Sequence, residues 1–154
     1  MKNIQEKVAE FQKQFNNPIL ETPSILKDRV ELRVGLIQEE LNELKESIRN
    51  NDLVEIADAL GDLQYVLSGA ILEFGFGECF EEIFNEIHRS NMSKACDTVD
   101  IAEKTIKFYK EKDGTESYYE KIRDKYVVYR KKDKKVLKSV NYSSVNLIDI
   151  LSKY

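Results

Sequence analysis

The stretch EELNELKESIRNNDLVEIADALGD, residues 39–62, carries two acidic groups on either side of a short polar break at residues 49–52. The six carboxylates belong to Glu39, Glu40, Glu43, Glu55, Asp58 and Asp62. Because so short a break forces the flanking helices to run antiparallel, the two groups are predicted to lie level with each other. Counting outward from the turn, Glu43 faces Asp58 and Glu39 faces Asp62. This stretch therefore predicts a helical hairpin with its carboxylates at one height.

Apolar residues at helical spacing extend this hairpin in both directions. They predict one helix over residues 24–48 and the next over residues 52–74, each with a stripe that faces the core. The stripe residues are Val30, Val34, Ile37, Leu41, Leu44 and Ile48 on the first helix, and Leu53, Ile56, Leu60, Leu63, Leu67 and Ile71 on the second.

The opposite faces of both helices are also apolar above the acidic level. Leu32 and Leu36 lead into the acidic row of the first helix, while Tyr65, Val66 and Gly69 follow the acidic row of the second. A fully solvated face would not carry such residues. We therefore expect another helix or another subunit to cover them.

The rest of the chain predicts further helices and a hairpin. The expected helices span residues 2–16, 78–92 and 99–112, strands 126–129 and 136–137 form the hairpin, and Ser143 or Ser144 caps a last helix through residue 151. The predicted fold is mainly α, with an antiparallel four-helix bundle core, a small C-terminal β-hairpin and a terminal helix. Residues 1–95 are expected to form the helical core, and residues 96–154 an extension packed on the same domain.

Composition limits the class of protein. The chain has 154 residues, of which 42% are apolar and 34% charged, and this suits one domain with a modest core. A net charge of -4 argues against a nucleic acid polymer or an anionic membrane as partner. No window reaches the ~18 apolar residues of a membrane span, and Cys79 and Cys96 are too few for a disulfide framework. We expect a soluble, cytoplasmic protein in a reducing compartment.

The clustered carboxylates favour a bound cation. Residues three or four apart share one helix face, so Glu40 acts together with Glu43, and Asp58 with Asp62. Like charges repel by ~1 kcal/mol at about 4 Å even in water. Oxygen ligands without His or Cys favour Mg²⁺, with Mn²⁺ as the alternative. A di-iron centre is excluded because the single histidine, His88, has no glutamate three residues before it. An ordinary solvated acidic face is the competing interpretation.

Basic and amide side chains gather at the end of the helix predicted over residues 78–92. Arg89 and Lys94 can bind phosphate oxygens, and Asn91 can donate a hydrogen bond beside them. The competing interpretation is structural, because the helix dipole favours basic residues near any helix C-terminus.

Four short motifs combine into a family pattern. The acidic motif is Glu40-x-x-Glu43 followed by Glu55-x-x-Asp58 and Asp62, and the others are Phe11-x-x-x-Phe15-x-x-Pro18, residues 88–94, and residues 136–138 with Asn141-Tyr142. Together they resemble the all-alpha nucleoside triphosphate pyrophosphohydrolases, a superfamily that includes the MazG proteins, the dimeric dUTPases and phosphoribosyl-ATP pyrophosphohydrolase. The last three motifs resemble the MazG-like, phosphoribosyl-ATP-pyrophosphohydrolase-like branch. The resemblance covers most of the chain.

The resemblance implies a Mg²⁺-dependent enzyme. Such an enzyme cleaves the bond between the α and β phosphates of a nucleoside triphosphate and gives a monophosphate and pyrophosphate, with dUTP and non-standard nucleotides among the candidate substrates. Relatives are homodimers or homotetramers, and this would cover the second apolar faces. The alternative function is a non-catalytic, nucleotide- or metal-binding helical module that regulates another process.

The resemblance also assigns roles to the motif residues. The metal ligands would be Glu40, Glu43, Glu55 and Asp58. The catalytic carboxylates would be Glu39 and Glu40, and Glu39 and Asp62 would bind a further ion or orient the water. The phosphates would be bound by Arg89, Asn91 and Lys94.

One segment departs from the compact members of the superfamily. The segment of residues 96–123 is longer than the corresponding segment of those members. It is expected to form a lid, a subunit contact or a surface elaboration. Three aromatic residues, Phe11, Phe15 and Tyr65, are candidates to stack on a nucleobase, although a place in the core is the simpler explanation for each.

Overall fold

The computed structural model describes residues 3–154, which divide into two compact units. The first contains the described residues up to Phe80 together with Leu151–Tyr154, and the second is Glu81–Ile150. The elements are α1 (Ile4–Gln14), α2 (Val30–Asn50), α3 (Leu53–Glu73), α4 (Phe80–Met92), α5 (Val99–Asp113), β1 (Ser117–Ile122), β2 (Lys125–Arg130) and α6 (Ile148–Leu151). This confirms the mainly helical class with a small hairpin and a C-terminal helix. No helix of the described residues is long and apolar enough to cross a membrane. The expected division at residue 95 stays a prediction.

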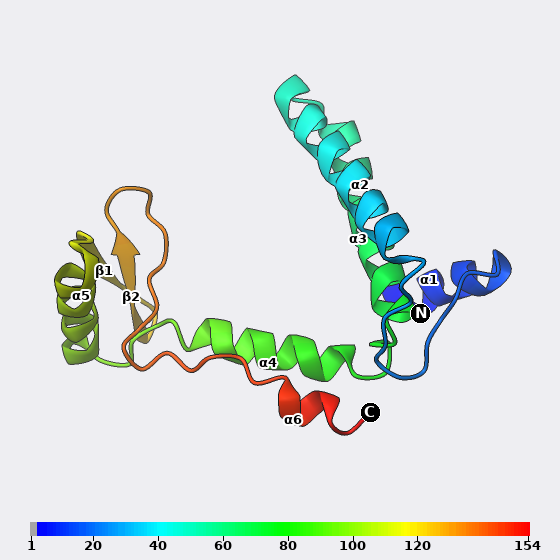
Figure 1. Cartoon of the computed structure of the whole chain (residues 1–154). Coiled ribbons are helices and arrows are strands. Elements are labelled where there is room, and N and C mark those ends of the chain that lie inside the picture. The colour runs from blue at the N-terminus through cyan, green and yellow to red at the C-terminus, as the bar shows by residue number, and fades with distance from the viewer. Residues whose placement is uncertain (1–2) are drawn as a thin grey trace. The chain divides into compact units, whose positions relative to one another are not determined.

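Helices α2 and α3 form the predicted antiparallel hairpin and lie side by side (Figure 1). The turn depends on Asn51, which adopts the left-handed conformation at φ 55° and donates its backbone N–H to the carbonyl of Ile48 at 3.2 Å. Asp52 then caps α3, since its side chain accepts from the N–H groups of Val54 and Glu55 at 3.0 and 3.2 Å. A cap of this kind stabilises a helix by about 1 kcal/mol. The turn thus fixes the register of the two acidic rows.

Helix α2 begins at Val30, six residues after the predicted start at residue 24. Ser24 lies outside the helix, where its backbone N–H donates to the carbonyl of Phe74 at 3.1 Å, and Arg29 takes the N-cap position. Leu20 likewise donates to the carbonyl of Leu72 at 3.1 Å. The segment before α2 therefore lies extended along the end of α3, and these long-range hydrogen bonds replace the first helical turns.

Helix α1 packs on α3 and completes the core of the first unit. Its N-terminus is fixed by a capping box, in which Asn3 Oδ1 accepts from the N–H of Glu6 at 2.8 Å and Glu6 Oε2 accepts from the N–H of Asn3 at 2.9 Å. Val8 and Gln12 are its buried residues. On α3, the buried side chains are concentrated in the last two turns, where α1 lies.

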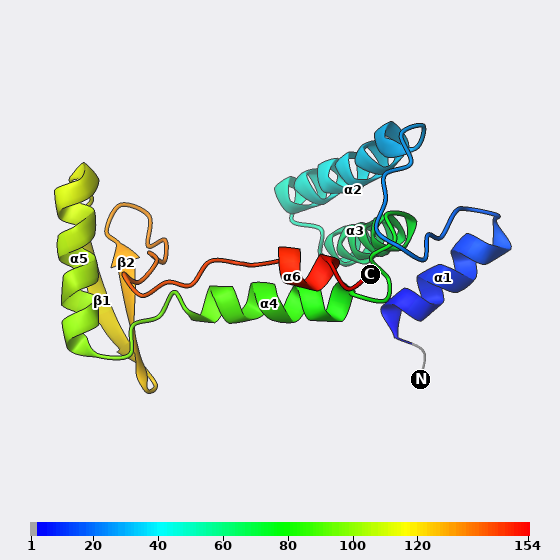
Figure 2. The same cartoon turned by 60° about the horizontal axis from the view of Figure 1, so that its bottom comes forward.

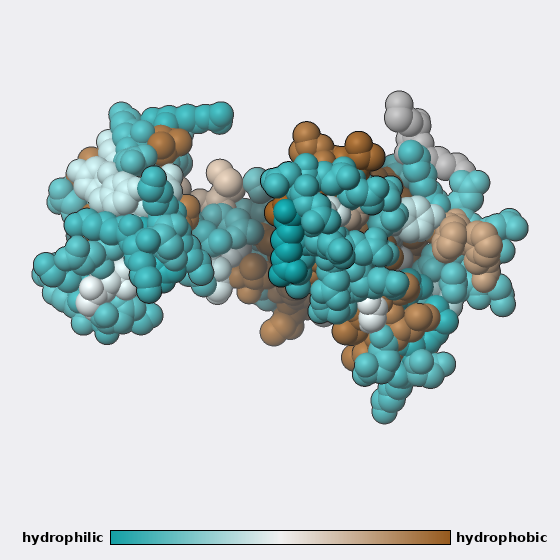
Figure 3. Space-filling model, turned by 90° about the horizontal axis from the view of Figure 1, so that it is seen from above, coloured by the Kyte–Doolittle hydropathy of each residue, from teal (hydrophilic) through white to brown (hydrophobic). Residues whose placement is uncertain are grey.

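The predicted core stripes of α2 and α3 are only partly buried. Ile71 is 6% exposed, but Val34, Ile48, Leu53, Leu60 and Leu67 are between 44% and 79% exposed. Figure 3 shows such apolar side chains in brown on the otherwise hydrophilic surface. The prediction was wrong for these positions because α1 covers only one end of the pair. The hairpin therefore presents an apolar stripe along much of its length.

The second unit contains a small apolar core, and Figure 2 shows its helix α5 beside the hairpin of β1 and β2. Cys96, Ala102, Val128 and Leu137 are buried there, and α5 packs against both strands. The chain enters and leaves this part at one point, because the N–H of Ser139 donates to the carbonyl of Lys94 at 3.1 Å.

The hairpin differs from the predicted one. Strand β2 pairs antiparallel with β1, a strand that the sequence did not predict, through a turn at Arg123 with φ 56°. The predicted partner, residues 136–137, forms only one bridge between Val136 and Tyr129 and one hydrogen bond from Leu137 N–H to the carbonyl of Val128 at 2.8 Å. The polar residues before Val136 make a wide turn that leaves too short a segment for a second full strand.

Candidate active site

The acidic level lies on the α2–α3 pair, and Glu40 is at its centre. Glu40 is half-buried, whereas the other five predicted carboxylates are exposed. Burial raises the pKa of Glu40, and it is raised further by the negative charges of Glu43, Asp62, Glu39 and Asp58. Because nearby charges of like sign raise the pKa of a carboxyl group, five of the six carboxylates share one electrostatic environment. Two of them come from α3, in agreement with the predicted register of the pair.

The sixth carboxylate, Glu55, lies nearer the turn. It lines an open pocket of about 390 Å³ together with Glu43, Glu46, Ser47, Asn50 and Asp52. Glu43 therefore belongs to both the group around Glu40 and the pocket at the turn. The sequence interpretation missed Glu46, although its position three residues after Glu43 extends the same acidic row.

The chemistry of these side chains suits a hard divalent cation, because every donor is a carboxylate oxygen. Among residues 3–154, no three His, Cys, Asp or Glu side chains are arranged as a metal site. Exposed carboxylates of like charge favour rotamers that separate them. The donor set therefore fits Mg²⁺ or Mn²⁺ in its chemistry, and binding would require rotation of exposed side chains.

An apolar pocket adjoins the acidic level. It has a volume of about 230 Å³ and lies between α1, α2 and α3, lined by Val8, Phe11, Gln12, Asn17, Arg29, Leu32, Arg33, Leu36, Tyr65, Val66 and Gly69. The apolar second faces noted in the sequence thus become pocket walls, and α1 supplies part of their cover. Phe11 and Tyr65 meet edge to face, with ring centroids 5.5 Å apart and planes at 87°. Phe15 contacts Phe11 but does not line the pocket.

The floor of the pocket is a buried ion network. Glu73 is 1% exposed and accepts from Arg29 Nε at 2.6 Å, from Arg33 Nε at 2.7 Å and from Arg33 Nη2. Burial acts to raise the pKa of Glu73, but hydrogen bonds and charges from the two arginines lower it below its ordinary value. Gln12 joins the network, since its Oε1 accepts from Arg33 Nη2 at 3.1 Å. The sequence interpretation missed this network, whose only local signal is Arg29 and Arg33 one turn apart beside apolar residues.

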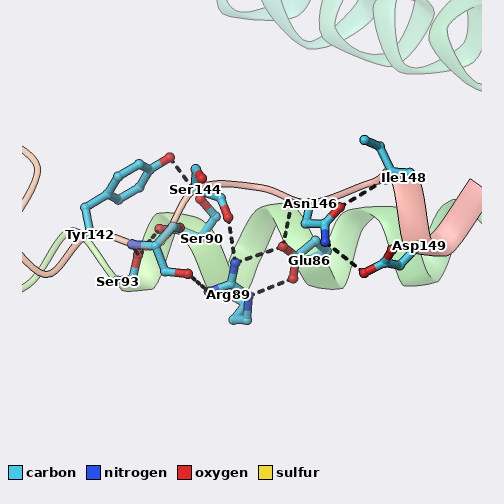
Figure 4. Close-up of polar contacts among 10 residues, drawn as sticks. Glu86, Arg89, Ser90, Ser93, Tyr142, Ser144, Asn146, Ile148 and Asp149 are labelled. Atoms are coloured by element: carbon cyan, nitrogen blue, oxygen red, sulfur yellow. Dashed lines mark hydrogen bonds and ion pairs between the residues drawn. The ribbon is translucent and has the colours of Figure 1, made fainter.

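The predicted phosphate-binding residues belong to the second unit. Arg89 donates to Glu86 at 2.7 and 2.8 Å, to Ser143 Oγ at 2.9 Å and to the carbonyl of Ser144 at 2.9 Å (Figure 4). Arg89 and the N–H of Asn146 lower the pKa of Glu86 to about 2. The segment 143–146 is thus tied to α4 by side-chain contacts.

The predicted cap of the last helix is not observed, while the predicted phosphate ligands at the end of α4 stay a prediction. Ser143 and Ser144 do not cap the last helix, because they contact Arg89; α6 begins at Ile148, whose N–H donates to Asn146 Oδ1 at 3.2 Å. Lys94 Nζ donates to Asn91 Oδ1 at 2.7 Å, so these two predicted phosphate ligands lie together at the end of α4.

Comparison with known proteins places these features in a family. A sequence model described as phosphoribosyl-ATP pyrophosphohydrolase matches residues 8–91, which include all of α2 and α3 and the whole acidic level. The chain is also similar to the uncharacterized protein L479 of Acanthamoeba polyphaga mimivirus, with 26% identity in an alignment that covers 94% of each chain.

Proposed function

Because the chain belongs to the phosphoribosyl-ATP pyrophosphohydrolase family, we propose that it is a Mg²⁺-dependent nucleoside triphosphate pyrophosphohydrolase. It would cleave the bond between the α and β phosphates and release a nucleoside monophosphate and pyrophosphate. The observation that carries this proposal is the group of carboxylates around Glu40, which lies within the matched residues.

In this proposal Glu40, Glu43, Glu55 and Asp58 hold the metal ion. When bound, Mg²⁺ supplies charge neutralisation for the triphosphate and lowers the pKa of a water molecule. Mn²⁺ is the alternative ion, because it accepts the same oxygen donors. Asp62, on the face of α3 toward Glu40, would support a second ion or orient the water.

Glu39 and Glu40 are the proposed catalytic carboxylates. The water oxygen forms a bond to the attacked phosphorus while the bond from that phosphorus to the bridging oxygen breaks. The water proton passes to a carboxylate, and we assign this role to Glu39, which is exposed and precedes Glu40 in the sequence. The bridging oxygen leaves with the phosphate that was not attacked, and the product that contains the attacked phosphorus gains the oxygen of the water.

The proposed phosphate ligands are Lys94, Asn91 and Arg89. Lys94 and Asn91 already form a hydrogen-bonded pair, which would present one positive charge and one amide to phosphate oxygens. Arg89 would have to exchange its contacts with Ser143 and Ser144 for a phosphate.

We further propose that the protein is a homodimer or homotetramer. The exposed stripe on α2 and α3 supports this, since side chains such as Leu53 and Leu60 are 79% and 50% exposed. Burial of such a continuous apolar face against a second copy follows the usual symmetry of homo-oligomers.

The test of function is release of pyrophosphate from a panel of nucleoside triphosphates in the presence of Mg²⁺. We expect turnover that disappears with EDTA and returns with added Mg²⁺. Absence of turnover over the whole panel, with nucleotide binding retained, would support the non-catalytic module instead. Absence of both turnover and binding would rule out both functions.

A further inference from the structure

The apolar pocket lies directly beside the acidic level, on the same face of the helix pair. Leu36 in the pocket wall is four residues before Glu40, a separation of about 6 Å along α2. Tyr65 is three residues after Asp62, about 4.5 Å along α3. A ligand that places phosphates at the acidic level would therefore extend its other end toward this pocket.

The walls of the pocket suit a flat ring. Phe11 and Tyr65 supply aromatic surface, and Leu32, Leu36 and Val66 supply aliphatic surface. The volume of about 230 Å³ equals the share of about eight water molecules in the liquid. This size suits a single six-membered ring with its substituents better than a fused pair of rings.

The floor of the pocket contains a hydrogen-bond donor that is open to a ligand. The side chain of Arg33 is 7% exposed, and its Nε and Nη2 are engaged with Glu73 and Gln12. Its Nη1 donates to no acceptor among residues 3–154, and it lies 2.9 Å from the point that a Cβ on Gly69 would occupy. The missing side chain at Gly69 therefore leaves Nη1 open to the pocket.

The acceptors of the floor, in contrast, are already occupied. Both carboxylate oxygens of Glu73 accept from arginines, Gln12 Oε1 accepts from Arg33, and Asn17 Oδ1 accepts from Arg29 at 3.3 Å. Arginine itself has donors only. The part of a ligand that reaches the floor of the pocket therefore meets a hydrogen-bond donor. It binds well only if it carries a hydrogen-bond acceptor.

We propose that this pocket binds the base of the nucleotide and selects a carbonyl oxygen over an amino group at the ring position opposite the sugar. This inference rests on the proposed function, because it places the phosphates at the acidic level. The position opposite the glycosidic bond enters deepest, and in a pyrimidine it is C4. Uracil and thymine carry an oxygen there, which accepts from Arg33 Nη1, whereas the amino group of cytosine leaves two donors facing each other.

The first test compares nucleotides that differ at this position. We expect kcat/KM for dUTP to exceed that for dCTP at least about tenfold, because a site with a buried donor discriminates strongly against a ligand without the matching acceptor. The pair ITP and ATP provides the same comparison in purines, with the same direction expected. Equal values for dUTP and dCTP, or a preference for dCTP, would overturn the inference and leave the proposed function intact.

The second test changes the aromatic wall. Tyr65→Ala should raise KM for dUTP at least about fivefold with a smaller change in kcat, because stacking acts on the base and not on the phosphates. The matched control is Phe15→Ala, which removes an aromatic ring that is 63% exposed and outside the pocket. Equal effects of the two substitutions would count against the pocket. Melting temperatures of both variants show whether either has lost its fold.

The third test separates the pocket from the reaction. Calorimetric titration of the metal-free protein with dUMP and with dCMP measures base recognition without turnover. Tighter binding of dUMP that is weakened by Tyr65→Ala supports the pocket, even if no triphosphate is hydrolysed and the proposed function fails. Equal binding of the two monophosphates refutes the pocket, whatever the hydrolysis assay gives.

Discussion

The two ends of the α2–α3 pair carry charge in opposite ways. Where α1 packs, Glu73 is buried and its negative charge is matched by Arg29 and Arg33. Toward the turn, the charges that act on Glu40 are all negative. In the first cluster the fold itself compensates the carboxylate of Glu73 with two arginines, whereas the second cluster is exposed to solvent and all the charges that act on Glu40 there are negative.

Under the proposed function, this difference separates a structural charge cluster from a cation-binding one. A buried carboxylate such as Glu73 destabilises the fold strongly when its cationic partners are removed. Exposed carboxylates can remain unmatched at a modest cost in folding, and that cost is recovered when a cation binds. We therefore expect substitutions at the first cluster to affect stability and substitutions at the second to affect activity.

The largest effect is expected for Glu73→Ala. It leaves two arginines, one of them buried, without their carboxylate, and the free energy of unfolding should fall by about 3–5 kcal/mol. Urea denaturation measures this loss. The exposed Glu39→Ala should change the free energy of unfolding by less than about 0.5 kcal/mol. A loss of less than about 1 kcal/mol for Glu73→Ala would contradict a structural role for this cluster.

Low pH should reproduce part of this loss. The folded pKa of Glu73 lies below its ordinary value of 4.5. Its contribution is therefore fully present above pH 4.5 and is lost as the pH falls through the folded pKa. Urea midpoints measured downward from pH 5 should fall for the wild type and fall less for Glu73→Gln.

At the second cluster, Glu43→Ala should reduce kcat/KM at least about 100-fold. Loss of a metal ligand removes several kcal/mol of charge stabilisation in the transition state. Pyrophosphate release at saturating Mg²⁺ is the measurement, and Glu31→Ala, an exposed carboxylate in the first turn of α2, is the control. An active Glu43→Ala would remove this residue from the site.

Mg²⁺ should stabilise the wild type but not Asp58→Ala. At a concentration 100 times its dissociation constant, a bound ion adds about 2.7 kcal/mol to the free energy of unfolding. Urea midpoints with and without Mg²⁺ measure the gain. An equal gain in Asp58→Ala would place the ion elsewhere.

The smallest effect is the pH dependence of the metal-free protein near Glu40. The folded pKa of Glu40 lies above its ordinary value of 4.5, so the folded state holds its proton to higher pH than the unfolded state. Stability should therefore decrease as the pH rises from 4.5 through the folded pKa, opposite in sign to the effect of Glu73. Glu40→Gln should flatten this decrease in urea midpoints. A decrease unchanged in the variant would assign it to another group.

The sequence predicted those features that depend on local periodicity. The spacing of apolar residues predicted α2 and α3, and the short break at Asn51 fixed their register, so the acidic level followed from helix geometry. Strand β1 was missed because its residues, Ser117–Ile122, mix tyrosines with charges and show no clear alternation. The late start of α2 was missed because it depends on a hydrogen bond between Ser24 and Phe74.

Long-range pairing explains the remaining gaps at the candidate site. Glu73 is separated from Arg29 and Arg33 by 44 and 40 residues, and Arg89 is separated from Ser143 by 54. The neighbouring residues in the sequence do not indicate which distant residues these side chains contact. The roles of the nine predicted site residues stay predictions, and the substitutions above test those of Glu43 and Asp58 directly.

The hydrogen bond between Ser139 and Lys94 has a consequence for engineering of the chain. The segment of residues 95–138 therefore begins and ends at neighbouring points, as an inserted domain does. A short linker could replace it without separating the end of α4 from the tail that this helix holds. Such a deletion would show whether the rest of the chain folds without this inserted segment.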